Sequence, residues 1–473
     1  MHAEITERLC NDPGLPHPNP TSSYWQEPVL ESVAALQSPQ LDENADILVI
    51  GSGITGCSVA RHLLDGNSNL KVTVLEARTV CSGATGRNGG HVKAVPEYSF
   101  AELVPSLGKE EADAVIRFTL ANPEALLRVK DTLSPELQKH CEVRRVESLN
   151  LFTDDGAVSQ FESLLEDFER SHPKRGRIVP RDELAQKFDV HNAAGGYLAP
   201  AGAGWPYRLI TGLFADMVKD YTDRFRLEAL TPVQSIEYLD AAQMYRVTTP
   251  RGSLHAKQVV HATNGHAGHL LPGIRGKLYP VRGQMTAQSP SARFGIQGAD
   301  RSWSIHYGTG FDYMTQSGTS GEIFLGGGLG QAYLHGLDEL GNVRDDVNSV
   351  LATAHLSGII NAVWCKDKSD TATVDVRAAW TGVMGFTTDG LPMVGKLAQE
   401  ATLRSGSGEW IAGGYNGYGM ANAWLSGKYV ADRILGKEDD GLLPQSYKYS
   451  AERLKSMQAE DGATHWMTAL GLD

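Results

Sequence analysis

Apolar runs that end in glycine mark the predicted strand ends of this chain. Residues 45–50 form one such run, which breaks into the pattern G-x-G-x-x-G at 51–56 and continues as a helical stretch. A second apolar run, 71–75, ends in an acid, Glu76. A strand, a glycine turn, a helix and a second strand ending in an acid are typical of the βαβ unit that binds a dinucleotide. The pattern therefore predicts an α/β fold that carries a nucleotide cofactor.

Each glycine of this turn has its own physical role. Gly51 permits the tight turn after the strand, Gly53 lets the backbone approach a pyrophosphate, and Gly56 lets the helix pack closely on the sheet. The helix N-terminus would offer free N–H groups to the phosphates. Glu76 would accept hydrogen bonds from the ribose hydroxyls and would repel a 2′-phosphate, which disfavours NADP. The other cofactor-binding residues predicted in this unit are Ser52, Ile54, Thr55, Ala77 and Arg78.

Helical and strand periodicities alternate along the rest of the chain. Apolar residues spaced three to four apart predict surface helices over 100–133 and 154–172. The predicted strands are 225–236, 244–249 and 258–265, with an antiparallel sheet of a second domain formed by 278–286, 311–315 and 322–328. Near the end of the chain, 410–421 predicts a strand and a glycine-rich turn, followed by a helix that ends at about residue 435.

The length predicts two closely packed domains. The chain has 473 residues, more than one hydrophobic core comfortably supports. Proline spacing within 11–20 argues against a helix and predicts an extended arm over 1–43, fixed to the body by Tyr24 and Trp25. The predicted division assigns 44–98, 174–275 and 378–445 to a Rossmann-like nucleotide-binding domain, 99–173 and 276–377 to a substrate domain with a mixed antiparallel sheet, and 446–473 to a C-terminal tail.

Charge and cysteine content narrow the possible partners. The net charge is −13 with no long basic run, which argues against a nucleic-acid partner. The five cysteines form no C-x-x-C pair and no His/Cys cluster, so neither a metal site nor a disulfide framework is predicted. No segment resembles a signal peptide or a membrane span. We expect a soluble cytoplasmic protein, with a peroxisomal address as an alternative and the oligomeric state left open.

Five motifs, in family order, resemble the FAD-dependent oxidoreductases of the D-amino-acid oxidase family, across roughly residues 20–440. They are 51–56 with Glu76, A-T-G-R-N-G-G at 84–90, V-H-A-T-N-G at 260–265, P-V-R-G-Q at 280–284, and G-Y-N-G-Y-G at 414–419 after D-G-L-P at 389–392. The second and last motifs resemble the γ-glutamylputrescine oxidase branch. The arm that leads to Ser23-Tyr24-Trp25 is similar to fungal members.

The resemblance implies that FAD binds with its adenosine half on the βαβ unit and its flavin ring where the two domains meet. One loop would run beside the flavin, with His91 as a hydrogen-bond donor, a covalent anchor or a structural residue; its residues are Ser82, Gly83, Ala84, Thr85, Arg87, Asn88, Gly89, Gly90 and His91. Val233 would meet the adenine, and Ala262, Thr263, Asn264 and Gly385 would flank the cofactor. A late turn would present backbone N–H groups to the N1–C2=O side of the flavin; it comprises Gly414, Tyr415, Asn416, Gly417, Tyr418, Gly419 and Met420.

Two departures from the family pattern bear on the substrate and on FAD attachment. Relatives that oxidise small amino acids clamp the carboxylate with an arginine after W-x-G-x, where this chain has Met384. Branches with covalent flavin have a cysteine near the same point, and 378–381 has none, so the FAD is predicted to be non-covalent. The pocket would then be mostly aromatic, with Arg208 and Arg377 as charged alternatives; its candidates are Trp205, Tyr207, Trp303, His306, Tyr307, Tyr313 and Tyr415.

The predicted reaction is oxidation of an amine or amino-acid derivative to an imine, which hydrolyses to a carbonyl while O₂ is reduced to H₂O₂. Aromatic faces would attract an ammonium group and desolvation would favour the neutral amine. The predicted catalytic residues are His91, Trp205, Tyr307 and Tyr415, mainly as orienting groups. The alternatives are a flavin dehydrogenase or biosynthetic oxidoreductase with another acceptor, a non-catalytic flavoprotein, and an NAD-dependent Rossmann protein.

Overall fold

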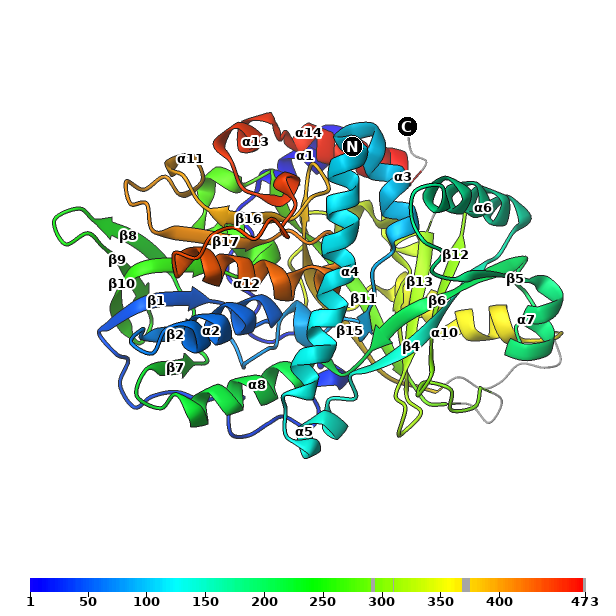
Figure 1. Cartoon of the computed structure of the whole chain (residues 1–473), viewed down its shortest axis with the longest axis horizontal. Helices are drawn as coiled ribbons and strands as arrows, with labels where there is room; N and C mark the ends of the chain where they lie inside the picture. Colours follow the sequence, from blue (N-terminus) through cyan, green and yellow to red (C-terminus); the bar gives the residue numbers. More distant parts are fainter. Residues whose placement is uncertain (291–293, 309, 368–374, 471–473) are drawn as a thin grey trace.

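Two sheets lie side by side along the long axis of the molecule (Figure 1). The computed structural model describes residues 1–290, 294–308, 310–367 and 375–470. Within these residues the strands form one eight-stranded and one nine-stranded sheet. The α/β fold predicted from the sequence is confirmed.

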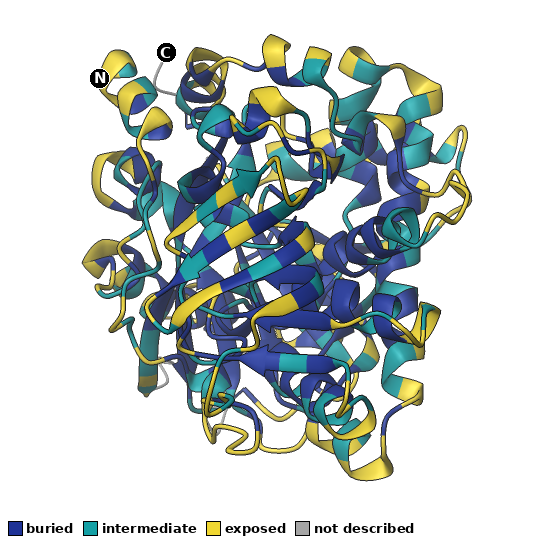
Figure 2. Ribbon diagram, turned by 90° about the vertical axis from the view of Figure 1, so that its left-hand side faces the viewer, coloured by how far each residue is buried: buried dark blue, intermediate teal, exposed yellow. Residues whose placement is uncertain are grey.

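The eight-stranded sheet contains the predicted βαβ unit at its centre. Its main path runs β16-β17-β10-β1-β2-β7, and β17, β10, β1, β2 and β7 are parallel. Its strands are β1 (Asn44–Ile50), β2 (Val72–Leu75), β7 (Phe225–Glu228), β8 (Ser235–Leu239), β9 (Met244–Thr249), β10 (Gly252–His261), β16 (Met393–Lys396) and β17 (Glu409–Gly413). The β8–β9 hairpin, at the left of Figure 1, faces the viewer in Figure 2, where exposed and buried residues alternate along the front strands. Because β10, β1 and β2 are parallel neighbours, their carboxyl ends meet at one edge of the sheet, which we call the carboxyl edge.

The nine-stranded sheet is mostly antiparallel, with one parallel pair between β4 and β12. Its order is β15-β11-β14-β13-β12-β4-β6-β3, with β5 paired to β6. The strands are β3 (His91–Val92), β4 (Arg144–Phe152), β5 (Arg177–Pro180), β6 (Gly195–Ala203), β11 (Leu278–Gln288), β12 (Arg301–Tyr307), β13 (Gly310–Gln316), β14 (Ile323–Gly327) and β15 (Val376–Thr387).

Helices cover both sheets. Helix α2 (Ile54–Gly66) follows β1 and packs against α12 (Ala423–Ile434) and α8 (Pro206–Asp220), and α4 (Lys109–Asp131) stands between the two sheets in Figure 1. The other α-helices are α1 (His2–Cys10), α3 (Pro96–Leu107), α5 (Pro135–His140), α6 (Asp155–Glu169), α7 (Arg181–Phe188), α9 (Ala267–Leu270), α10 (Val350–Trp364), α11 (Gln399–Thr402), α13 (Ala451–Ser456) and α14 (Ala459–Ala469). No helix in the described part of the chain is long and apolar enough to cross a lipid bilayer.

The register of the nine-stranded sheet places one row of side chains on a single face. Cross-strand partners share a face of a sheet. The pairs link Trp380 on β15 to Met285 on β11, Gly326 on β14, Tyr313 on β13 and Ser304 on β12, and then Asn150 on β4. This face meets the loop that follows β2, because Thr315 donates a hydrogen bond to the Gly89 carbonyl at 2.6 Å and the Trp380 indole donates one to the Arg87 carbonyl at 3.0 Å.

The structure differs from the sequence-based division in four places. Strands β3, β5, β6 and β15 belong to the nine-stranded sheet, although 44–98, 174–275 and 378–445 had been assigned to the nucleotide-binding domain. Residues 2–10 of the predicted arm form α1, since the prolines begin only at Pro13. The predicted helix over 100–133 is two helices, separated at Gly108, whose φ is +78°. The predicted C-terminal tail includes α13 and α14, and α14 packs on α1.

The close helix–strand approach at Gly56 yields a stability prediction. A Cβ at Gly56 would lie 1.9 Å from the Gly51 carbonyl oxygen, a backbone atom that cannot move aside without displacing the turn. We expect Gly56→Ala to lower the free energy of unfolding by about 1–3 kcal/mol through overpacking. The measurement is urea denaturation followed by far-UV circular dichroism.

Gly358→Ala is the matched control for this substitution. Gly358 lies within α10, is exposed, and has no atom within 4 Å of an added Cβ. Alanine should therefore leave stability unchanged or raise it by up to about 1 kcal/mol, because of its better helix propensity. Equal effects at the two positions would contradict the close-packing role of Gly56.

Candidate functional site

The glycine turn after β1 has the conformation that its sequence predicts. Gly51 has a φ of +107°, and a Cβ there would lie 2.7 Å from the Ala262 carbonyl oxygen. The Ile54 N–H donates to the Thr85 hydroxyl at 3.0 Å. The backbone N–H and the hydroxyl of Ser52 both donate to Glu76 Oε2, and the Arg78 N–H donates to Glu76 Oε1. The glycine turn, Glu76 and Thr85 are thus brought together at the carboxyl edge.

The loop 82–91 runs from the carboxyl edge to β3 and is held largely through its own backbone. The Arg87 guanidinium donates to the carbonyls of Ser82, Thr381 and Thr21 at 2.7–2.8 Å. Asn88 forms local hydrogen bonds, accepting from the Gly90 N–H and donating to the Thr85 carbonyl. Burial lowers the pKa of Arg87 to about 10, against the opposing effect of Asp345. Sequence reasoning expected Arg87 to meet the pyrophosphate or the flavin edge, whereas here its donors are used on carbonyl groups.

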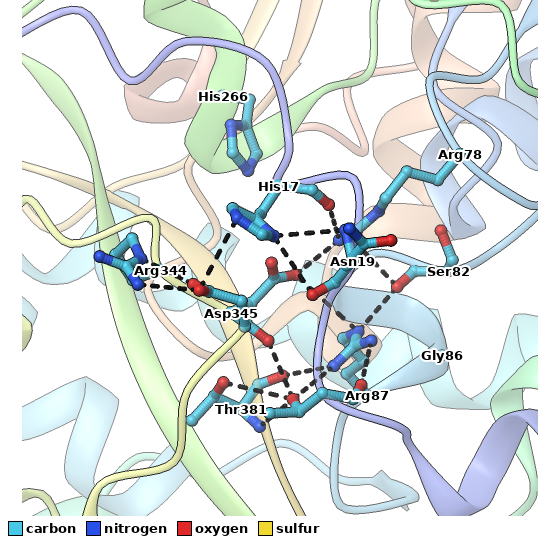
Figure 3. Close-up of polar contacts among 12 residues, drawn as sticks. His17, Asn19, Arg78, Ser82, Gly86, Arg87, His266, Arg344, Asp345 and Thr381 are labelled. Atoms are coloured by element: carbon cyan, nitrogen blue, oxygen red, sulfur yellow. Dashed lines mark hydrogen bonds and ion pairs between the residues drawn. The ribbon is translucent and has the colours of Figure 1, made fainter.

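The N-terminal arm crosses the carboxyl edge directly above β1. His266 follows β10, and its Nδ1 lies 3.1 Å from the Gly14 carbonyl oxygen. Arg78 follows β2 and donates to the His17 carbonyl at 3.1 Å. Because β10 and β2 flank β1, the segment 14–17 spans the end of the strand that carries the glycine turn (Figure 3). The predicted role of the arm aromatics is confirmed by Trp25, which is 2% exposed and stacks on Phe324.

One buried carboxylate fixes the arm at its centre. Asp345 pairs with Arg78 at 2.9 Å and lies 4.0 Å from Arg87, and all three side chains are at most 9% exposed. The Asp345 carbonyl accepts hydrogen bonds from the N–H and the hydroxyl of Thr21. The cluster therefore joins the arm to the loops after β2 and β14 (Figure 3).

The late glycine turn joins three segments. Asn264 Oδ1 accepts the Gly414 N–H at 2.9 Å, and the Asn416 N–H donates to the Gly385 carbonyl at 3.0 Å. The Tyr415 hydroxyl lies 2.9 Å from the Thr55 hydroxyl, so its ring faces α2. Gly419 and Met420 begin the short 3₁₀-helix Gly419–Ala421, whose first N–H groups have no acceptor within the helix. This helix lies against β3, next to His91.

A set of aromatic rings gathers beside His91. The neighbouring ring centroids of His91, Tyr313, Phe311, His306 and Tyr98 are 5.6–6.4 Å apart. Tyr418, from the late glycine turn, interacts electrostatically with Tyr98 and is 42% exposed. We call this set the aromatic cluster; it comprises His91, Tyr98, His306, Phe311, Tyr313 and Tyr418.

Lys93 lies beside the aromatic cluster and was missed by sequence reasoning. Its ammonium group donates to Ser148 Oγ at 2.9 Å, Asn150 Oδ1 at 2.7 Å and Ser304 Oγ at 3.1 Å. Burial lowers the pKa of Lys93 to about 8, and burial together with the Lys93 charge lowers the pKa values of His91 and His306 to about 3. Both histidines are therefore neutral. A possible signal was the alternation His91-x-Lys93, which puts both side chains on one side of an extended segment.

Several predicted pocket residues lie elsewhere. Trp303 and Tyr307 occupy the opposite face of β12, where they pack towards α10, and Tyr307 donates to Asp312 and Gln331. Trp205 lies in a cluster with Trp25 and Phe324, beneath the Arg208 guanidinium at 3.4 Å, and Tyr207 is buried in the adjoining core. Arg377 is exposed. Of the predicted set, His91, His306 and Tyr313 come together.

Two remaining predictions concern residues at the edges of the site. Met384 packs with the apolar cluster that α1 and α14 share with Val281. Val233 is 3% exposed and belongs to the core beside β10. In the described residues, no three His, Cys, Asp or Glu side chains gather in a way that could hold a metal ion.

Comparison with known proteins identifies the family. The family model for FAD-dependent oxidoreductases of the DAO type matches residues 46–433. The chain is 24% identical over 443 residues to the probable oxidoreductase OrdL of Rhizobium meliloti, covering 90% of this chain and 91% of that protein. It is 23% identical over 423 residues to γ-glutamylputrescine oxidoreductase of Escherichia coli, covering 88% and 89%.

Solved structures share the fold. Glycine oxidase from Geobacillus kaustophilus has a TM-score of 0.67 at 18% identity, covering 87% of this chain and 99% of that one. L-Proline dehydrogenase from P. horikoshii has a TM-score of 0.65 at 22% identity, covering 87% and 99%. This protein belongs to the DAO family of FAD-dependent oxidoreductases.

The carboxyl edge has polar atoms that suit FAD. Ser82 Oγ, Thr263 Oγ1 and Arg78 Nε are buried without a hydrogen-bond partner among the residues that the structure describes. They follow β2 and β10, on either side of the glycine turn. Buried polar groups of this kind require partners, which the phosphate and hydroxyl oxygens of FAD can supply. The residues present therefore fit the cofactor of the family.

The Asp345 cluster gives a prediction about cofactor retention. Asp345→Asn would leave the buried Arg78 and Arg87 guanidiniums without a counter-charge, so we expect a loss of about 3–5 kcal/mol in unfolding free energy. Because the cluster anchors the arm above the glycine turn, FAD should also leave faster. Flavin fluorescence after dilution of the holoenzyme measures the release rate.

Asp346→Asn is the neighbouring control. Asp346 pairs with Arg344, whose side chain is 60% exposed, and lies 3.7 Å from His17 of the arm, whose side chain is 36% exposed, so solvent screens both contacts. We expect little change in stability or in FAD release. If both variants released FAD at the wild-type rate, the arm would have no part in retaining the cofactor.

Proposed function

We propose that this protein oxidises the C–N bond of an amine or amino-acid derivative to an imine, which water hydrolyses, with O₂ as electron acceptor and H₂O₂ as product. The observation that carries the proposal is the aromatic cluster, which adjoins the end of loop 82–91 in a chain of the DAO family and would line the substrate pocket. Bound FAD would supply the oxidant, accepting a hydride (one proton with two electrons) from the substrate carbon while the nitrogen loses a proton.

The FAD-binding residues are proposed from their placement at the carboxyl edge. Glu76 would accept from the ribose, and the glycine turn with Ser52, Thr55, Ser82 and Thr85 would surround the pyrophosphate and ribitol. Thr263 would approach from β10, and the turn 414–420 would reach the flavin beside His91. Attachment is proposed to be non-covalent, since 378–381 contains no cysteine.

The pocket residues would prepare the amine for oxidation. Tyr98, Phe311 and Tyr418 offer aromatic faces that attract an ammonium group. The same enclosure removes water and favours the neutral amine, whose lone pair supports loss of hydrogen from the adjacent carbon. His91 and His306, both neutral, can donate or accept hydrogen bonds without adding charge. The proposed contribution of the protein is therefore orientation and desolvation rather than a charged base.

The proposed placement within the family, near the γ-glutamylputrescine oxidase branch, rests on sequence similarity. The Escherichia coli relative is named for γ-glutamylputrescine, a polyamine derivative, which supports placing this chain near that branch. Similarity of the arm to fungal members and cytoplasmic location stay predictions, and the oligomeric state stays open. A dehydrogenase using another acceptor is the second candidate, because one similar structure is an L-proline dehydrogenase.

Anaerobic bleaching of the flavin absorbance tests the proposed activity. A panel of primary, secondary and acylated amines, with and without carboxylates, should include members that bleach the bound flavin in the absence of O₂. An O₂ pulse should then restore the absorbance within seconds and release H₂O₂ in equal amount to the flavin. Slow reoxidation would favour the dehydrogenase, and a flavin that no amine bleaches would favour a non-catalytic flavoprotein.

A further inference from the structure

Lys93 is a partly buried cation without an anionic partner. Within the described part of the chain it forms no ion pair, and its three hydrogen bonds go to the neutral oxygens of Ser148, Asn150 and Ser304. Those acceptors account for all three donors of an ammonium group. A charge removed from water is costly unless an opposite charge compensates it. The positive charge of Lys93 is therefore not compensated by a carboxylate that hydrogen-bonds to it.

The nearest charged groups of the protein do not supply that charge. Glu97 on α3 favours the charged form of Lys93, but its carboxylate lies 3.6 Å from Arg175 and accepts the Tyr197 hydroxyl at 3.0 Å. Arg175 in turn disfavours the Lys93 charge. His91 and His306 face Lys93 from β3 and β12 and are neutral. Lys93, Glu97 and Arg175 together carry one net positive charge.

Two imidazole nitrogens beside Lys93 also lack partners. His91 Nε2 and His306 Nε2 are buried and have no hydrogen-bond partner among the described residues. A neutral imidazole can carry its proton on Nε2 and donate it. Two such donors next to an ammonium group are suited to the two oxygens of a carboxylate.

We propose that Lys93, with His91 and His306, forms a carboxylate-binding subsite, so that the substrate is an amine that also carries a carboxylate. This inference rests on the proposed amine oxidation. It accounts for Met384, which stands where relatives that oxidise small amino acids have a carboxylate-binding arginine, and which here packs in an apolar cluster. The counter-ion is supplied from the other end of the same sheet, by a lysine on the segment that follows β3. Lys93 is thus a specificity-determining residue.

Benzoate binding to the holoenzyme tests the subsite without requiring turnover. Benzoate and its uncharged analogue benzamide have the same shape, and calorimetry together with the flavin difference spectrum measures their dissociation constants. We expect Lys93→Met to weaken benzoate binding at least tenfold and leave benzamide unchanged. Lys93→Arg should retain benzoate binding, because it keeps the positive charge. Unchanged benzoate affinity in Lys93→Met would overturn the proposal.

The pH dependence of wild-type binding is a second, independent measurement. Lys93 is charged below its pKa of about 8, so benzoate affinity should be constant below that pH and fall by about tenfold per unit above it. Lys93→Arg should show no such fall up to about pH 10, because a guanidinium stays protonated there. A flat wild-type profile to pH 10 would overturn the subsite even if Lys93→Met did not fold.

The two proposals fail in different ways. If amines bleach the flavin but benzoate binding does not depend on Lys93, the subsite is rejected and the amine oxidation stands. If benzoate binding depends on Lys93 but no amine bleaches the flavin, the oxidation is rejected and the subsite stands. Among amines that bleach, kcat/KM in wild type should favour those with a carboxylate, and Lys93→Met should remove that preference.

Discussion

The rest of the site depends on how one buried loop satisfies its backbone polar groups. Loop 82–91 passes between the two sheets, where water cannot solvate its carbonyls, and an unpaired buried carbonyl is costly. The carbonyls of Ser82, Gly86, Arg87 and Gly89 all accept hydrogen bonds from side chains. The donors come from the arm, from the loop itself and from β13 and β15. The path of this loop fixes where His91 and Lys93 enter the second sheet.

This constraint explains why most donors of two arginines that the sequence placed at the cofactor are used on groups of the protein itself. An arginine has five donors in a fixed fork, so it can bind several carbonyls at once. Arg87 uses that fork on Ser82, Thr21 and Thr381, and Arg78 donates to His17 and Ser82 while pairing with Asp345. Helix N-termini, hydroxyl groups and Arg78 Nε remain as the donors that we propose for the FAD phosphates. A motif identifies the loop correctly without revealing which of its side chains face inward.

The sequence predicted the backbone features of the site better than its side-chain contacts. The glycine turn follows from conformation and close approach, which depend on local residues alone. Placing Tyr307 and His306 needed the face of β12, and one residue of register reverses that assignment. Trp205 could not be placed because its partner, Trp25, comes from the arm, some 180 positions earlier. Lys93 belongs to no recognised motif. Its role could be inferred only from its hydrogen bonds to Ser148, Asn150 and Ser304, and these three residues come together only through the pairing of β4 with β12.

The arm couples cofactor retention to the packing of the two sheets. Thr21 accepts from Arg87 on the loop and from the Thr381 N–H on β15, which is 360 positions away in sequence. Contacts of such long separation form only after both partners have their final positions, because closing a long loop costs entropy that the contacts must repay. The arm can therefore dock above the glycine turn only when β15 already lies beside loop 82–91. A change that separates the sheets would then loosen the arm even though it touches none of the arm's residues, and it would open the carboxyl edge, where we propose that FAD binds.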